Sequence, residues 1–231
     1  MPEMTKESII IKYEGLLSRI YRFFFNARFH FIGRGNKIDW HNTFAKRNRI
    51  KIVGGGNSIS FFGGKLTRAQ NCNFFIYGSN NKIIIHSHVV LKNVTFYIEN
   101  DNNTIEIFDD SYINHDVELA ASEGTSITIG KGCLFSSFII VRTHDSHAVL
   151  DANTRLRINH PKDVIIGDHV WVGNGATILK GANIGKDSIV SIKAVVVGKT
   201  YPPESVIAGN PGEIKRSGVS WDVDRFIPFA E

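Results

Sequence analysis

Cysteine and proline are scarce in this sequence of 231 residues, which has two cysteines and six prolines. Neither Cys72 nor Cys133 lies in a Cys-x-x-Cys motif, so we do not expect a disulfide framework. A reducing cytosol is the simplest compartment, and no signal peptide is expected. The few prolines stand against 21 glycines, a balance that suits a chain with many tight turns.

Neither disorder nor a strong excess of one charge is indicated. Charged residues make up 21% of the chain and hydrophobic residues 42%, so the chain can bury a core. Lys and Arg number 27 against 22 Asp and Glu, a net charge of +5. This balance favours an anionic ligand without identifying it.

Large aliphatic residues return at every sixth position in the C-terminal half. They are Ile166, Val172, Ile178, Ile184, Val190 and Val196. A small residue or valine stands four positions after each of the first five: Val170, Ala176, Ala182, Ser188 and Ala194. A period of six fits neither the 3.6 of a helix nor the alternation of a flat strand. It predicts an all-β fold, a parallel β-helix of triangular coils of about 18 residues.

A second repeat, Asn-x-Ile, occupies the N-terminal half. It starts at Asn36, Asn57, Asn81 and Asn103, and Thr125 takes the asparagine position in the next unit. The intervals of 21, 24, 22 and 22 residues are each close to one coil. Gly or Asn usually precedes the motif, and both tolerate left-handed backbone, so they mark a recurrent corner. We therefore expect one solenoid over residues 31–206 rather than a separate β-sandwich.

The two ends differ from the repeats. Residues 1–30 are basic and aromatic, and we expect a helix over about residues 5–26 that covers the first coil. Its charges interrupt it too often for a membrane span, although a helix lying on an anionic membrane surface is the alternative. Residues 207–231 hold an Ala-Gly-Asn-Pro turn and a tail with Trp221, which we expect to pack on the solenoid or on a neighbouring subunit.

Residues 127–216 resemble the hexapeptide-repeat acyltransferases, which have a left-handed parallel β-helix. The resemblance is carried by IGDHVWVG from Ile166, by the further hexapeptides and by the AGNP loop at 208–211. RTHDSH at 142–147, followed by Asp151 and Asn159, is similar to the O-acetyltransferases that modify polysialic acid and other bacterial capsules. The resemblance implies acetyl-CoA as co-substrate, a sugar hydroxyl as acceptor, no metal, no nucleic acid and a cytoplasmic homotrimer with active sites between subunits.

Acetyl transfer to a hydroxyl needs a base, donors for the oxyanion and a proton for the departing thiolate. His147 is the predicted base, because it lies in a polar run directly after an apolar strand. Trp171 follows it by 24 residues, and the resemblance implies that the Trp171 amide faces the oxyanion while its ring lines the acceptor groove. His144 is a reserve candidate, since on a straight strand residues 144 and 147 point to opposite faces.

Candidate acceptor contacts lie around this motif and one coil earlier. Asp145 and Asp116 are the carboxylates expected to orient the imidazole or bind the acceptor. The resemblance implies acceptor contacts in the coil below the catalytic histidine, which places His115 and Glu118 beside Asp116. His144 is expected among these contacts if it is not the base.

Coenzyme A is a long anion and needs backbone amides and cations. The resemblance implies pantetheine contacts at Gly173, Asn174, Ile192 and Val197. The phosphates need positive side chains, and Lys180, Lys199, Lys215 and Arg216 lie near the right end of the chain to supply them.

Two other functions fit the same fold. One is N-acetylation of an amino nucleotide sugar. The other is a zinc-dependent, carbonic-anhydrase-like solenoid, which needs three converging histidines. His144/His147 and His86/His88 are close pairs, but no third ligand stands one coil away. A purely structural solenoid would have no need of THDSH, Trp171 and the AGNP loop together.

Overall fold

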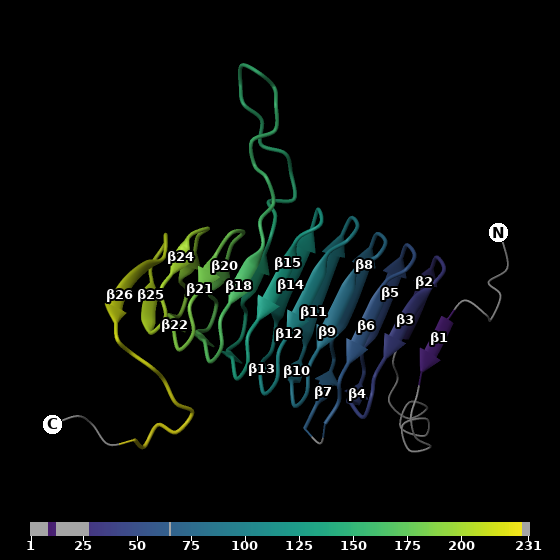
Figure 1. Ribbon diagram of the computed structural model, residues 1–231, viewed down its shortest axis with the longest axis horizontal. Coiled ribbons are helices and arrows are strands. Elements are labelled where there is room, and N and C mark those ends of the chain that lie inside the picture. Colours follow the sequence, from purple (N-terminus) through teal and green to yellow (C-terminus); the bar gives the residue numbers. More distant parts are fainter. Residues whose placement is uncertain (1–8, 13–27, 65, 228–231) are drawn as a thin grey trace.

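The computed structural model describes residues 9–12, 28–64 and 66–227. They form a parallel β-solenoid whose stacked coils build three sheets, one on each face (Figure 1). Sheet A contains β1 (Ile9–Lys12), β3 (Asn36–Asp39), β6 (Ser58–Phe61), β9 (Lys82–Ile85), β12 (Thr104–Ile107), β15 (Ser126–Ile129), β18 (Val164–Ile166), β21 (Asn183–Ile184) and β24 (Thr200–Tyr201). Sheet B contains β2 (Arg28–Ile32), β5 (Arg49–Val53), β8 (Asn73–Tyr77), β11 (Val94–Glu99), β14 (Val117–Ser122), β17 (Ile140–Arg142), β20 (Thr177–Ile178) and β23 (Val195–Val196). Sheet C contains β4 (Phe44–Lys46), β7 (Arg68–Gln70), β10 (Val90–Lys92), β13 (Tyr112–Ile113), β16 (Leu134–Phe135), β19 (Trp171–Val172), β22 (Ile189–Val190), β25 (Ser205–Ala208) and β26 (Glu213–Ser217).

Each coil runs from sheet A through sheet C to sheet B, and neighbouring coils pair in parallel. Only β26 pairs antiparallel among the described strands, folding back on β25 at the last coil. The turn from sheet B into the next sheet A strand is called the B/A corner, and the turn from sheet C into sheet B the C/B corner. Ile105 pairs with Ile127 and Ile166 pairs with Ile184, so a coil takes 22 residues in the first half and 18 in the second.

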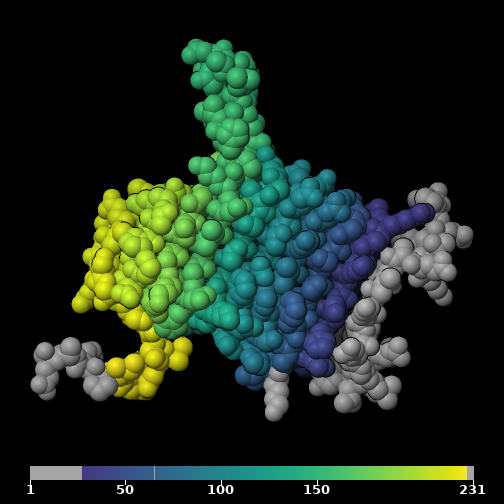
Figure 2. All heavy atoms as spheres, viewed as in Figure 1, coloured from purple at the N-terminus to yellow at the C-terminus, as the bar shows by residue number. Residues whose placement is uncertain are grey.

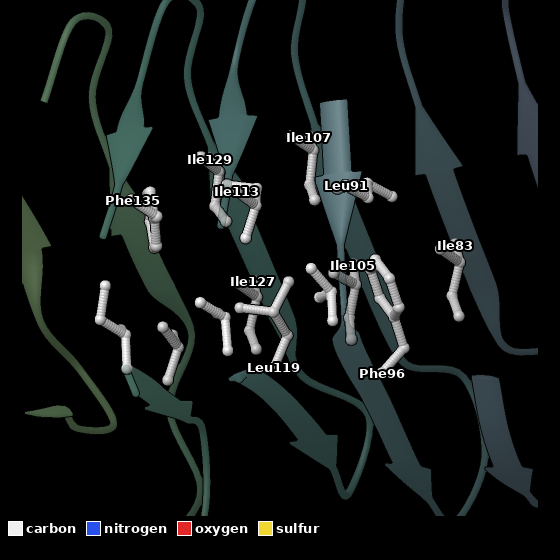
Figure 3. Packing of buried hydrophobic residues seen from close by; sticks show 14 of the residues in the cluster. Ile83, Leu91, Phe96, Ile105, Ile107, Ile113, Leu119, Ile127, Ile129 and Phe135 are labelled. Carbon is white, nitrogen blue, oxygen red and sulfur yellow. The ribbon is translucent and has the colours of Figure 1, made fainter. Parts of the chain in front are cut away.

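Aliphatic side chains fill the interior of the coils, as the six-residue period predicts. All six residues of the aliphatic series and all five of the small-residue series are at most 1% exposed. The longer N-terminal coils enclose more volume and fill it with larger side chains, among them Phe74 and Phe96, which stack with ring centroids 4.8 Å apart. Figure 3 shows this column continuing through Ile105, Ile127 and Phe135. The predicted fold class, an all-β parallel β-helix, is confirmed.

A ladder of buried asparagines runs along the B/A corner. The Asn57 carboxamide donates to Asn36 Oδ1 at 3.0 Å, Asn81 donates to Asn57 at 3.1 Å, and Asn103 donates to Asn81 at 2.9 Å. The residue before each is in the left-handed region, for example Asn102 at φ 62°, which confirms the predicted corner. The side chains thus satisfy corner amides and carbonyls that the sheets leave unpaired.

The chain ends depart from the predictions in one respect. Within the expected helix, residues 9–12 form strand β1, which pairs with β3, so the helix prediction is wrong there. The rest of that prediction, including the membrane-surface alternative, falls outside the described residues. No helix in the described part of the chain is long and apolar enough to cross a membrane. Trp221 of the C-terminal tail packs on the solenoid as expected, since it stacks on His169 at 4.3 Å and donates to its carbonyl at 2.7 Å, whereas Phe226 and Ile227 are exposed.

Candidate active site

A hairpin arm interrupts the solenoid between β17 and β18, at the B/A corner. It spans residues 144–161 and projects from the coils as the green loop in Figures 1 and 2. Lys162 N–H donates to Thr143 O at 3.0 Å and closes its base, and Leu150 bridges Arg157 in antiparallel fashion. The asparagine ladder stops here, because Thr125 replaces asparagine and its hydroxyl contacts Thr143 Oγ1 at 2.6 Å.

Two polar contacts anchor this arm to the coils. Arg157 forms a two-pronged ion pair with Glu123, at 2.6 and 2.9 Å, and this hydrogen bonding lowers the pKa of the Glu123 carboxyl. Asp145 binds both Lys180 Nζ and Asn159 Nδ2, the latter at 2.8 Å. Burial raises the pKa of Asp145, but these hydrogen bonds outweigh it and leave that pKa below its ordinary value.

The second anchor also fixes the backbone of the motif that carries the histidines. Asn159 Nδ2 donates to His147 O at 2.8 Å, and Asn159 Oδ1 accepts the Val149 N–H at 2.7 Å. His147 N–H donates to Asp145 O at 2.8 Å. The main chain of His147 is therefore held on both sides while its ring is left to the solvent.

A cleft of about 350 Å³ opens between the base of the arm and the outer face of sheet B. The outward side chains of β11, β14 and β17 form its floor, and the first residues of the arm form its wall. The lining residues are Tyr97, Glu99, Glu118, Ala120, Arg142, His144, Ser146 and His147.

The two histidines of this cleft have opposite environments. His147 is exposed, and within the described chain neither of its ring nitrogens has a hydrogen-bond partner. His144 is 6% exposed, and its Nδ1 accepts the Ser146 N–H at 3.1 Å. Burial lowers the pKa of His144. The chain bends at Ser146, which has φ 66°, so both histidines line one cleft instead of pointing to opposite faces of a straight strand.

The floor of the cleft contains two carboxylates and one guanidinium. Arg142 donates from Nη2 and Nε to Glu118 Oε1, at 2.6 and 3.1 Å. The Tyr97 hydroxyl donates to Glu99 Oε1 at 2.8 Å, and this hydrogen bond raises the pKa of Tyr97 to about 12. Each carboxylate therefore has one oxygen engaged and another that can accept a hydrogen bond from a ligand.

The structure brings together some of the predicted acceptor residues and separates others. Glu118 and His144 line the cleft with His147. Asp145 binds Lys180 and Asn159, so it anchors the arm rather than orienting the His147 ring. His115 and Asp116 lie at the C/B corner, outside the cleft lining, where Asp116 accepts from Asn93 Nδ2 at 2.5 Å.

Sequence reasoning missed most of the floor. Tyr97, Glu99, Ala120, Arg142 and Ser146 line the cleft without having been assigned a role. Tyr97, Ala120 and Arg142 are register partners on three successive strands of sheet B. Counting back by 22 or 23 residues from Arg142 would have found the other two.

Trp171 lies on β19 in sheet C, away from the cleft lining of its own chain. Its ring is 40% exposed and lies 6.2 Å from Trp221. Its main-chain N–H donates to Ser188 O at 3.0 Å, as parallel coils require. Its hydrogen atom is therefore engaged between coils in this chain, a geometry that does not support the predicted role of this amide in facing an oxyanion.

The predicted coenzyme A residues border both sides of sheet B. Gly173, Asn174 and the 66% exposed Ile192 lie at the C/B corner, whereas Lys180, Val197 and Lys199 lie at the B/A corner. The Asn174 N–H donates no hydrogen bond to any described residue. Lys180 pairs with Asp145 and Lys215 pairs with Glu213 at 2.8 Å, while Arg216 is exposed on β26. No group of three His, Cys, Asp or Glu side chains that could hold a metal occurs in the described ranges.

Known proteins are similar to this chain in sequence and fold. No family model matches the sequence. The polysialic acid O-acetyltransferase of Neisseria meningitidis is 31% identical over 163 residues, which cover 64% of this chain and 68% of the relative. A polysialic acid O-acetyltransferase of Escherichia coli O1:K1 is 33% identical over 96 residues, which cover 42% of this chain and about a third (31%) of that relative's length.

Solved structures of polysialic acid O-acetyltransferases have the same fold as this chain. The crystal structure of the polysialic acid O-acetyltransferase OatWY superposes with a TM-score of 0.79 at 26% identity, covering 87% of this chain and 92% of that one. The polysialic-acid-specific acetyltransferase NeuO, at 24% identity and a TM-score of 0.61, shares the fold. A parallel β-helix with a six-residue repeat on each face, together with these relatives, defines the class as the hexapeptide-repeat acetyltransferases. Within that class, this chain belongs to the polysialic acid O-acetyltransferase family.

Proposed function

We propose that this enzyme transfers the acetyl group of acetyl-CoA to a hydroxyl of an acidic capsular polysaccharide, such as polysialic acid, with His147 as the general base. The observation that carries the proposal is the His147 ring, whose nitrogens are free to take a proton beside an open cleft. The names of the relatives support the acceptor class. The two buried, unpaired cysteines are consistent with a reducing cytosol as the site of action.

The reaction needs no covalent enzyme intermediate. A ring nitrogen of His147 takes the proton of the sugar hydroxyl as its oxygen attacks the thioester carbonyl carbon. The tetrahedral intermediate then collapses, the carbon–sulfur bond breaks, and the imidazolium returns the proton to the thiolate of coenzyme A. Because Asn159 and Asp145 hold the His147 main chain on both sides, the ring moves only about its own side-chain torsions.

The cleft floor suggests which side of the acceptor it binds. The floor holds two negative charges, on Glu99 and Glu118, and one positive charge, on Arg142. A sugar carboxylate would therefore be repelled there. Hydroxyl groups, by contrast, can donate to the free carboxylate oxygens. We therefore assign the hydroxyl-bearing face of the sugar to the floor and its carboxylate to the solvent side.

Acetyl-CoA and a second subunit complete the proposed site. We expect the pantetheine arm to follow sheet B past Gly173, Ile192 and Val197, with the phosphates near Lys199, Lys215 and Arg216. The unpaired Asn174 amide replaces the Trp171 amide as the candidate oxyanion donor. In a homotrimer, Trp171 of a neighbour would line the acceptor groove, and the arm's exposed Leu156 and Ile158 would find a partner surface.

An acetyl-CoA turnover assay on the intact enzyme tests the proposal. We expect coenzyme A release with polysialic acid or a uronic acid polymer, and His147→Ala should lower kcat by about 10²–10⁴-fold without changing the melting temperature. His160→Ala, an exposed histidine on the same arm, is the matched control and should retain full activity. More than a tenth of the rate remaining in His147→Ala would assign the base elsewhere, and turnover of amino nucleotide sugars alone would make the enzyme an N-acetyltransferase.

A further inference from the structure

His144 carries a buried, unsatisfied polar atom on a side chain that lines the cleft. Among the buried side-chain nitrogen and oxygen atoms of the described residues, only His144 Nε2 lacks a hydrogen-bond partner. The side chain is 6% exposed and lines the same cleft as His147. A buried polar group without a partner costs about 1–3 kcal/mol, so proteins rarely keep one that has no use.

The surroundings of the ring fix which nitrogen carries its hydrogen. Nδ1 accepts the Ser146 N–H at 3.1 Å, and an accepting nitrogen must present a lone pair. The neutral ring therefore carries its hydrogen on Nε2. Burial disfavours the charged ring and lowers the pKa of His144, so the neutral form is the one present at pH 7. Ser146 adopts φ 66° to make this contact, an uncommon conformation for a serine.

The nearest acidic groups of the cleft are turned to other donors. Glu99 Oε1 accepts from the Tyr97 hydroxyl, and Glu118 Oε1 accepts from Arg142. Neither carboxylate contacts His144 Nε2. The Nε2 hydrogen is thus a neutral donor without an acceptor among the described residues, on a side chain that lines the cleft.

We propose that His144 is a specificity-determining residue whose Nε2–H donates a hydrogen bond to an oxygen of the acceptor sugar near the hydroxyl that is acetylated. The inference rests on the proposed function, and it divides the roles of the two histidines. His147 has free ring nitrogens and moves the proton. His144 has its Nδ1 lone pair engaged and its Nε2 protonated, so it binds the acceptor and takes no proton.

Two substitutions on the full-length enzyme separate this role from a structural one. His144→Gln keeps an N–H donor at a similar reach, whereas His144→Leu fills the site without a donor. We expect His144→Leu to raise KM for the acceptor polysaccharide about tenfold, with KM for acetyl-CoA within about twofold of the wild type. A tenfold change corresponds to about 1.4 kcal/mol, the scale of one buried hydrogen bond. His144→Gln should stay within about threefold of the wild type.

Each other outcome has a clear meaning. Leu and Gln variants with the wild-type acceptor KM would overturn the assignment, as would variants that change both KM values equally. If neither variant folds, the wild type still answers, because ¹⁵N chemical shifts of its imidazoles report the tautomer. Hydrogen on Nδ1, or an Nε2–H signal of His144 unmoved by saturating acceptor, would overturn the inference. A wild type that acetylates no sugar would instead refute the proposed function, and this inference with it.

Discussion

Replacing Asn103 by alanine tests whether the asparagine ladder holds the corner beneath the cleft. Asn103 is fully buried, and its Oδ1 accepts from Gly124 N at 2.9 Å and Thr125 N at 3.0 Å. Its Nδ2 donates to Asn81 Oδ1 and to Glu99 O, both at 2.9 Å. One side chain therefore ties together three successive coils.

The expected loss follows from the groups left without partners. Gly124 is exposed, so water can replace its lost bond, and Asn81 Oδ1 keeps the main-chain N–H of residue 103 at 2.8 Å. The buried Thr125 N–H and the Glu99 carbonyl have no such replacement. At about 1–3 kcal/mol for each orphaned group, the loss is about 2–6 kcal/mol. For a domain of this size, that corresponds to about 4–24 °C in melting temperature.

Thermal unfolding followed by circular dichroism at fixed protein concentration measures the effect. Asn102→Gly is the matched control, because Asn102 is exposed and its φ of 62° suits glycine. The control should change the melting temperature by no more than about 2 °C. If Asn103→Ala unfolds at the same temperature as the control, the ladder does not stabilise this corner and the reasoning fails.

Two further outcomes follow from the arm and the core. Arg157→Ala removes the ion pair with Glu123 and should lower kcat several-fold. The melting temperature should change little, because exposed ion pairs contribute about 0–1 kcal/mol. Arg155→Ala removes the same charge from the same arm without breaking an ion pair and should keep the wild-type rate, so equal rates of the two variants would refute the anchoring role. Burial raises the pKa of both Cys72 and Cys133 to about 12, so a thiol reagent at pH 8 should modify neither in the native protein and both after unfolding, whereas rapid modification of the native protein would contradict the packed core.

The solenoid could be predicted from the sequence because a local repeat determines which residues form its core. Each coil meets only its neighbours, so a six-residue rhythm such as Ile166, Val172 and Ile178 determines the burial of every face. The Asn-x-Ile repeat likewise marked the corners. The repeat did not predict that the asparagine itself is buried. Asn57 and Asn81 are as buried as the isoleucines that follow them. Hydrogen bonding between coils reverses the usual preference of asparagine for the surface.

The residues of the site that lie together in sequence were predictable from one motif, and the family resemblance added Glu118 from one coil earlier. His144 and His147 share one short motif and could be identified, but their roles depend on the bend at Ser146. Tyr97 and Glu99 reach the cleft from two coils earlier, and only the register of sheet B brings them there. For Trp171, the motif does not reveal that the coil stacking already uses its main-chain N–H.

The position of the arm coincides with a change in coil size, and this change shapes the proposed site. Before the arm, β11 and β14 have six residues each and span about 20 Å, so sheet B presents a broad face. After the arm, β20 and β23 have two residues each and span about 7 Å. In the proposed site, a broad face suits a hydroxylated sugar ring, whereas a narrow ridge between two corners suits an extended pantetheine chain. His147 lies at the step between them, where an acceptor hydroxyl on one side can meet a thioester on the other. The change in coil length at the arm thus accounts for the two different surfaces on which we propose that the two substrates bind.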